Sequence, residues 1–228
     1  MASSPAMQPK YQYSKPSLKG KMVLNTEQAK FFSGNRFDSL MTALFIVDVT
    51  SRKLAKNLKS FDHKAVVAAV SKKIERMEVA ISDETERMEA LLKSLGIKER
   101  AEYTSPLTRQ FEITSPEIKR MSNLLQAFDN LIMLVDTAWL HEKIDSAEAD
   151  EFRAAKSNQM GRLIRSLVGL GQSARAKAYS SKVAELHEDI EAAEAMASTE
   201  KDQREANGYI EPGNADPLDA LPDESVAA

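Results

Sequence analysis

The spacing of apolar residues predicts helices along most of this chain. From residue 40 to residue 58 they recur every three to four positions, which predicts a helix whose N-cap is Asp38 or Ser39. A nearly heptad repeat extends from about Asp62 to just before Gly96 and predicts a second, longer helix that ends there. Such a helix needs a packing partner, which is either a second copy of the chain or the first helix.

Residues 107–113 have the alternating pattern of a β-strand instead. One side of this strand carries Leu107, Arg109, Phe111 and Ile113, and the other carries Thr108, Gln110, Glu112 and Thr114. A lone strand leaves its backbone groups without partners, so we expect it to pair with the same strand of a second copy. A two-stranded ribbon of this kind fits the major groove of DNA.

Helix signals resume immediately after the strand. Ser115 is a good N-cap, and Pro116 follows at a position where its missing N–H costs nothing. The helix that they begin is strongly apolar from Ile118 to Leu140, and it is apolar on nearly all sides from Leu131 to Val135. It is therefore predicted to lie at the centre of the core.

Two more helices are predicted towards the C-terminus. Asp145 and Glu148 form a capping-box pattern that begins the first of them, and Gly169 and Gly171 indicate its end. The second is predicted over about 173–198. Its charge changes from basic to acidic along its length.

These elements predict a mainly α fold, a helical bundle with a single β-strand that forms an intermolecular two-stranded ribbon. Proline, glycine and polar residues at both ends predict unstructured termini. We therefore expect a basic flexible arm over 1–35, a helical DNA-binding and dimerisation domain over 36–200, and an acidic disordered tail over 201–228.

The charge is distributed unevenly, although the net formal charge of the 228 residues is only −3. Residues 1–36 carry six basic residues and one acid, whereas residues 185–228 carry two basic residues and thirteen acids. Residues 152–184 contain seven basic residues and no acid. A positive body of this kind favours a polyanion partner, although such charges also serve simply to solvate helix faces.

The residue types argue against catalysis. The chain has no cysteine, which excludes disulfides and thiolate-ligated metals, and its three histidines lack metal-ligand spacing. It contains neither a phosphate-binding loop nor a recognisable hydrolase or metalloprotease motif. No apolar run approaches twenty residues, and no signal sequence is evident. We therefore expect a cytoplasmic protein that is not an enzyme and binds no cofactor, metal or membrane.

The junction at Gln110–Pro116 resembles that of ribbon-helix-helix repressors of the Arc type, in which an alternating strand also precedes a helix. This resemblance implies base contacts by outward strand residues and a phosphate contact at the helix start. Carried over by position, the base-contacting residues are Thr108, Gln110, Glu112 and Thr114, with Ser115 at the DNA backbone. The chain departs from that pattern in its longer following helix and in the negative charge of Glu112, although glutamate can accept a hydrogen bond from cytosine N4.

From about residue 31 to residue 177 the chain also resembles the AcaB-like family of transcriptional activators of conjugative plasmids and integrative elements. The resemblance rests on residues 34–37, residues 54–58, the long helix rich in glutamate and methionine, and the strand at 108–113. It implies an elaborated ribbon-helix-helix fold that binds promoter DNA and activates conjugation genes.

The resulting hypothesis is a sequence-specific regulator that acts as a homodimer, with the pairing of dimers into tetramers left open. Arg109 belongs to the buried face by strict alternation, yet near the strand end it could reach phosphate or guanine. Lysines of the arm are expected to contact phosphates: Lys10, Lys15, Lys19 and Lys21. The alternative is a helical scaffold of a DNA-processing or secretion complex, in which the strand binds a partner protein.

Overall fold

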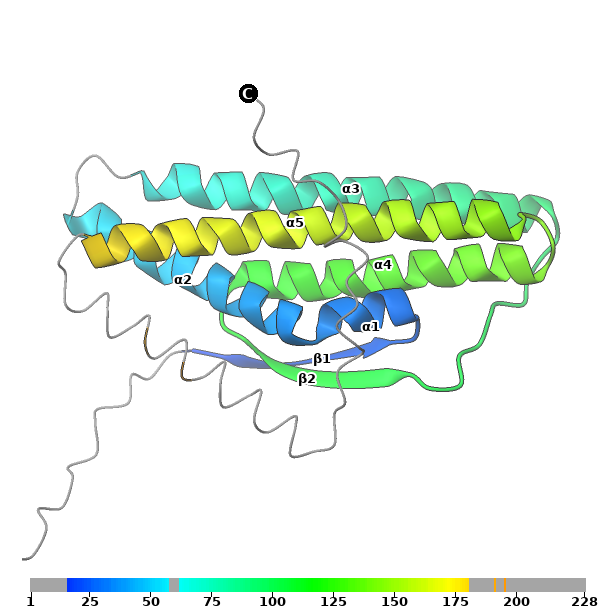
Figure 1. The fold of residues 1–228 in the computed structure, drawn as a ribbon, viewed down its shortest axis with the longest axis horizontal. Coiled ribbons are helices and arrows are strands. Elements are labelled where there is room, and N and C mark those ends of the chain that lie inside the picture. Colours follow the sequence, from blue (N-terminus) through cyan, green and yellow to red (C-terminus); the bar gives the residue numbers. More distant parts are fainter. Residues whose placement is uncertain (1–15, 58–61, 181–190, 192–194, 196–228) are drawn as a thin grey trace, which may run out of the picture.

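A computed structural model describes residues 16–57 and 62–180, together with residues 191 and 195. Within these ranges the chain forms two strands and five helices: β1 (Leu18–Leu24), α1 (Glu27–Ser33), α2 (Asn35–Asn57), α3 (His63–Ser94), β2 (Leu107–Ile113), α4 (Pro116–Leu140) and α5 (Ser146–Ser180). Figure 1 shows the four long helices lying side by side. The two strands and α1 lie on one side of this bundle, and α3 lies on the opposite side (Figure 1).

Several helix ends lie where local chemistry predicted them, but α2 begins at Asn35, before its predicted N-cap at Asp38 or Ser39. The Asp62 side chain accepts a hydrogen bond from the backbone N–H of Ala65 at 3.1 Å and caps α3. After α3, Gly96 has a φ of 72°, which glycine adopts without the strain of a side chain. Ser115 caps α4, whose first residue is Pro116, and both predictions are confirmed.

The core is centred on α4, as its all-round hydrophobicity predicted. Thirteen of its residues are buried, and it contacts the other four helices and both strands. The near-heptad rows of α3 bury Val70, Ile74, Met77 and Ile81 in the same core. The neighbours that cover α3 are α4, α2 and α5 of its own chain, so no second copy is needed to bury this stripe.

The prediction that the helix after residue 145 ends at Gly169 and Gly171 is wrong. α5 continues through both glycines to Ser180. Gly171 is buried where α5 crosses α2, and a Cβ built there would lie 2.5 Å from Ala43 Cβ. This glycine therefore permits a close approach of two helices rather than a helix end. The predicted helix over 173–198 thus begins as part of α5, and most of its remainder lies outside the described residues.

The strand at 107–113 is confirmed, but its predicted lack of a partner in the same chain is not. β2 pairs antiparallel with β1, with Leu18 opposite Ile113 and Leu24 opposite Leu107. The expected flexible arm over 1–35 accordingly contains a strand, β1, and a helix, α1. The predicted acidic tail over 201–228 lies outside the described residues.

Candidate nucleic-acid interface

The outer face of the β1–β2 ribbon gathers five of the ten side chains predicted to contact DNA. Three pairs of residues face each other across the strands and are all exposed: Lys19 and Glu112, Lys21 and Gln110, Val23 and Thr108. Paired residues of an antiparallel ribbon point to the same side, so these six side chains form a single surface. We call this surface the outer ribbon face.

Lys19 and Glu112 carry opposite charges at directly paired positions, yet they are not joined. Within the described part of the chain, no ion pair or side-chain hydrogen bond engages Lys19, Lys21, Gln110 or Glu112. Opposite charges across strands usually attract each other only weakly in water. All four side chains are therefore available to an external ligand.

The inner face of the ribbon fixes it firmly to the helical core. Met22 and Leu24 of β1 are fully buried, and the Phe111 ring of β2 meets the Phe37 ring edge-on at 5.3 Å between centroids. Opposite Phe111 stands Gly20, where an added Cβ would lie 2.6 Å from that ring. The missing side chain leaves room for Phe111, and the ribbon lies directly on the start of α2.

Arg109 strengthens this attachment instead of facing outward. It is 5% exposed, forms an ion pair with Asp38 of α2, and donates from Nη1 to the carbonyl oxygen of Gly34 at 3.1 Å. Its guanidinium also lies 4.8 Å from the centroid of the Phe37 ring. The prediction of a DNA contact by Arg109 is therefore corrected: strict alternation holds, and a buried acid provides its partner.

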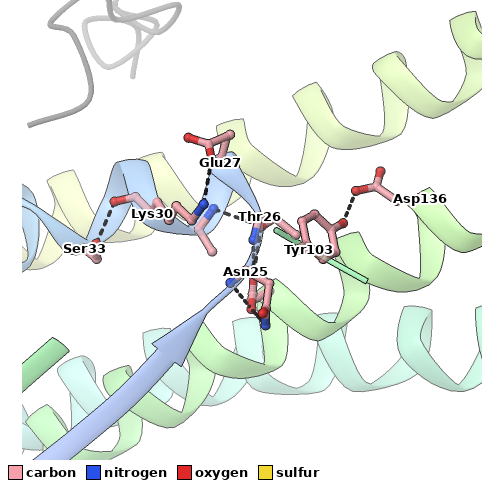
Figure 2. Close-up of polar contacts among 9 residues, drawn as sticks. Asn25, Thr26, Glu27, Lys30, Ser33, Tyr103 and Asp136 are labelled. Carbon is pink, nitrogen blue, oxygen red and sulfur yellow. Dashed lines mark hydrogen bonds and ion pairs between the residues drawn. The ribbon is translucent and has the colours of Figure 1, made fainter. Parts of the chain in front are cut away.

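The turn between β1 and α1 is held by a single buried carboxylate of α4. Asp129 accepts hydrogen bonds from the backbone N–H groups of Asn25 and Thr26 at 2.9 and 2.8 Å, and from both of their side chains. Thr26 in turn caps α1 by accepting from Ala29 N–H. Figure 2 shows Asn25 and Thr26 at this turn, where β1 meets α1. The carboxylate thus satisfies donors that would otherwise be unpaired and fixes the end of β1.

The segment that leads into β2 is anchored to α4 as well. The Tyr103 hydroxyl donates to Asp136 (Figure 2), and Arg153 of α5 donates to the same carboxylate from Nε at 2.7 Å. Burial and this hydrogen bond raise the pKa of Tyr103 well above its ordinary value. The turn after β1 and the segment before β2 are therefore both anchored to α4.

The start of α4 does not provide the expected phosphate site. Ser115 is buried, and its hydroxyl already accepts from Ile118 N–H at 3.4 Å. Pro116 has no N–H to offer, and Glu117 adds a negative charge in the first turn. The predicted contact of Ser115 with the DNA backbone is thus corrected, while Thr114 is half-buried beside it.

The basic residues elsewhere divide into two groups. Arg153 and Lys156, within the predicted basic run, form ion pairs with Asp136 and Glu84 and hold helices together. Arg162 and Arg165 are exposed on α5. The predicted arm residues Lys10 and Lys15 lie outside the described residues, so their DNA contacts stay predictions.

Sequence reasoning placed Lys19 and Lys21 in an arm and missed their place beside Gln110 and Glu112. The signal was the alternation of Lys19, Lys21 and Val23 with Met22 and Leu24. Gly20 interrupts this alternation at an inward position, because the Phe111 ring occupies the space of its side chain.

Two further properties concern the described residues only. No helix there combines the length and apolar character that crossing a bilayer requires. Nor do three or more potential metal-ligating side chains gather at any point of the same ranges.

Comparison with known proteins gives a likeness in fold. No protein-family model matches the chain, and no curated protein matches its sequence. Among solved structures, the chain is similar to the crystal structure of selenomethionine-containing AcaB from uropathogenic E. coli, with a TM-score of 0.69 and 24% sequence identity. The match covers 80% of this chain and 90% of the AcaB chain. The chain therefore has an AcaB-like fold.

Proposed function

We propose that this protein is a sequence-specific DNA-binding regulator that inserts its outer ribbon face into the major groove. The observation that carries the proposal is the exposed row of Lys19, Lys21, Thr108, Gln110 and Glu112 on a ribbon whose other face is buried. These are side chains that hydrogen-bond base edges or phosphates. Because the ribbon is fixed to α2 and α4, they reach DNA already arranged and little ordering entropy is lost on binding.

The dimensions of the outer ribbon face suit the groove. Residues two apart on a strand are separated by roughly 6.7 Å, so the three cross-strand pairs span about 13 Å. That length corresponds to about four base-pair steps of roughly 3.4 Å each. Two strands lie about 4.8 Å apart, and the major groove, about 12 Å wide, accepts a two-stranded ribbon.

The charges of the face support DNA more than a neutral partner. Lys19 near one end of the ribbon and Lys21 near its middle are both positive. Glu112 is the single acid among the six residues of the outer ribbon face. Binding through such residues releases counterions, so affinity should fall as salt rises.

The resemblance of the sequence to AcaB-like activators supports the finer parts of the proposal. We propose on that ground that the DNA is promoter DNA, and that binding activates genes of conjugative transfer. Self-association also remains part of the proposal, but with a different role from the one predicted. Since β1 completes the ribbon, a second copy adds a second complete ribbon instead of half of one.

A scaffold function is the second candidate, and exposed apolar residues favour it. Leu91 and Leu95 near the end of α3, and Trp139 and Leu140 at the end of α4, are all exposed. Both helices end on the same side of the bundle (Figure 1). Apolar surface of this kind is typical of a contact with another protein.

A binding assay on the protein's own upstream DNA separates the two candidates. We expect retention of that DNA at low salt, weakened at high salt, and a loss of about 1–3 kcal/mol for Gln110→Ala. Lys72→Ala is the matched control, because Lys72 is exposed on α3, across the bundle from the ribbon (Figure 1). If the folded wild-type protein retains no DNA at low salt, the regulator proposal fails and the scaffold is favoured.

A further inference from the structure

The two strands of the ribbon present different side chains to the same surface. β1 contributes Lys19, Lys21 and Val23, and β2 contributes Thr108, Gln110 and Glu112. A ribbon made of two copies of one strand would repeat the same residues about a twofold axis. The outer ribbon face has no such axis, since each cross-strand pair joins two different residue types.

We propose that one chain reads an asymmetric DNA element, with a G·C pair at the Lys19–Glu112 end and an A·T pair at the Val23–Thr108 end. This inference rests on the proposed function and specifies its ligand. It follows from the register of the strands, which places the charged pair and the methyl-bearing pair at opposite ends of the face.

The charged end has the chemistry to recognise both bases of a G·C pair. Lys19 can donate to guanine O6 and N7, while Glu112 can accept from the N4 amino group of cytosine. The two residues face each other across the strands, and no ion pair joins them in the described structure. Glu112, whose charge counted against a DNA contact when taken alone, acquires a specific role beside Lys19.

The other end has no charge and offers methyl groups. Val23 and Thr108 are paired there and exposed, and apolar contacts of this type favour the C5-methyl group of thymine. Between the two ends, Gln110 can bond an adenine at N6 and N7, and Lys21 lies opposite it. The expected base preference therefore changes along the ribbon from G·C at the Lys19–Glu112 end to A·T at the Val23–Thr108 end.

A second copy does not restore symmetry within the groove. One edge of β2 is already occupied by β1, so two chains could join strands only through their remaining edges. Three strand spacings of about 4.8 Å would make that four-stranded sheet about 14 Å wide between its outer strands. The major groove is only about 12 Å wide, so it admits the ribbon of one chain at a time.

The test is selection of bound duplexes from a library with a randomised centre, using the full-length protein. Three ribbon variants are compared with the wild type: Gln110→Ala, Glu112→Gln and Thr108→Ser. Lys72→Ala on α3 is the control, and circular dichroism confirms that each variant is folded. Native mass spectrometry then counts the chains bound to the shortest selected duplex.

We expect each ribbon to select a core, spanning about four base-pair steps, that is not self-complementary, and the minimal duplex to carry as many such cores as chains bound to it. Each ribbon variant should weaken the preference for one particular base, at one base pair only. Gln110→Ala should reduce that base preference by at least about fivefold. The loss for Thr108→Ser should be about fourfold, the equivalent of one buried methyl group. The positions altered by Glu112→Gln and Thr108→Ser should lie about four base pairs apart.

Two other results would overturn the inference in distinguishable ways. A core that is self-complementary within the footprint of one ribbon, about four base-pair steps, with each variant altering two symmetry-related positions there, would refute the asymmetric reading while leaving DNA binding intact. A wild-type protein that enriches no sequence at all would refute the proposed function itself, and the inference with it.

Discussion

Replacing Arg109 with methionine tests whether this residue holds the ribbon to the core. The substitution keeps a long apolar stem but removes the guanidinium that pairs with Asp38 and donates to the Gly34 carbonyl. The side chains of Arg109 and Asp38 are only 5% and 9% exposed, so water cannot replace the lost partner. The Asp38 carboxylate is then left buried without its guanidinium.

The expected loss of stability is large because the pair is buried. At hydrogen-bonding distance and an effective dielectric constant of about 20, the Coulomb attraction is roughly 5 kcal/mol, which largely offsets the cost of desolvating both charges. Removing one partner leaves the desolvation cost of the other, and breaking a buried pair in this way typically costs about 3–5 kcal/mol. For a protein of this size, Tm should fall by about 6–20 °C.

Urea unfolding at pH 7, followed by circular dichroism at 222 nm, measures this loss. Arg109→Met combined with Asp38→Asn should recover roughly half of it, because the second change removes the buried charge that has lost the guanidinium. The reasoning is refuted if Arg109→Met costs less than about 1 kcal/mol, or if the double variant is no more stable than the single one.

Two further predictions concern the helical bundle. Gly171→Ala should destabilise the protein by about 1–3 kcal/mol, because the new Cβ would lie 2.5 Å from Ala43 Cβ. Gly169→Ala has nothing within 4 Å of its new Cβ and should instead gain up to about 1 kcal/mol from helix propensity. Equal effects of the two substitutions on thermal unfolding would contradict the close crossing of α2 and α5. The raised pKa of Tyr103 means that the unfolded chain loses this proton above about pH 10 while the folded chain keeps it, so stability should fall as pH rises beyond that value. Tyr103→Phe should flatten that fall in urea midpoints measured at about pH 9 and 11, and an unchanged slope would show that Tyr103 does not contribute to it.

The elements that sequence predicted well are those decided by local chemistry. Ser115 and Pro116 begin α4, and Asp62 begins α3, because an N-cap needs only the next few residues. The burial of α4 was equally accessible, since a helix that is apolar on all sides has to be covered. The period of the strand placed Arg109 on the inward face, but Arg109 was also predicted to contact DNA, and its partner Asp38 was not predicted.

The features that sequence missed depend on contacts between distant segments. β1 was not predicted because Gly20 interrupts its alternation. The structure explains this glycine, since the Phe111 ring of the paired strand occupies the space that a side chain would need. Gly171 was taken for a helix end because local rules cannot distinguish a terminating glycine from one that admits a neighbouring helix. The outer ribbon face was consequently half predicted: its β2 residues were found, and its lysines were assigned to an arm.

The position of the two strands in the chain has a consequence for how the protein matures. β1 is synthesised before three helices, α1 to α3, and β2 only after them. Helices form within about a microsecond from nearby residues, whereas pairing of distant strands must first close the long intervening loop. A growing chain can therefore form the helices α1 to α3 before the ribbon, although α4, on which the core is centred, follows β2 in the chain. The surface that we assign to DNA is completed only once residue 113 has been made, so an unfinished chain carries the lysines of β1 without the residues that would direct them to a sequence.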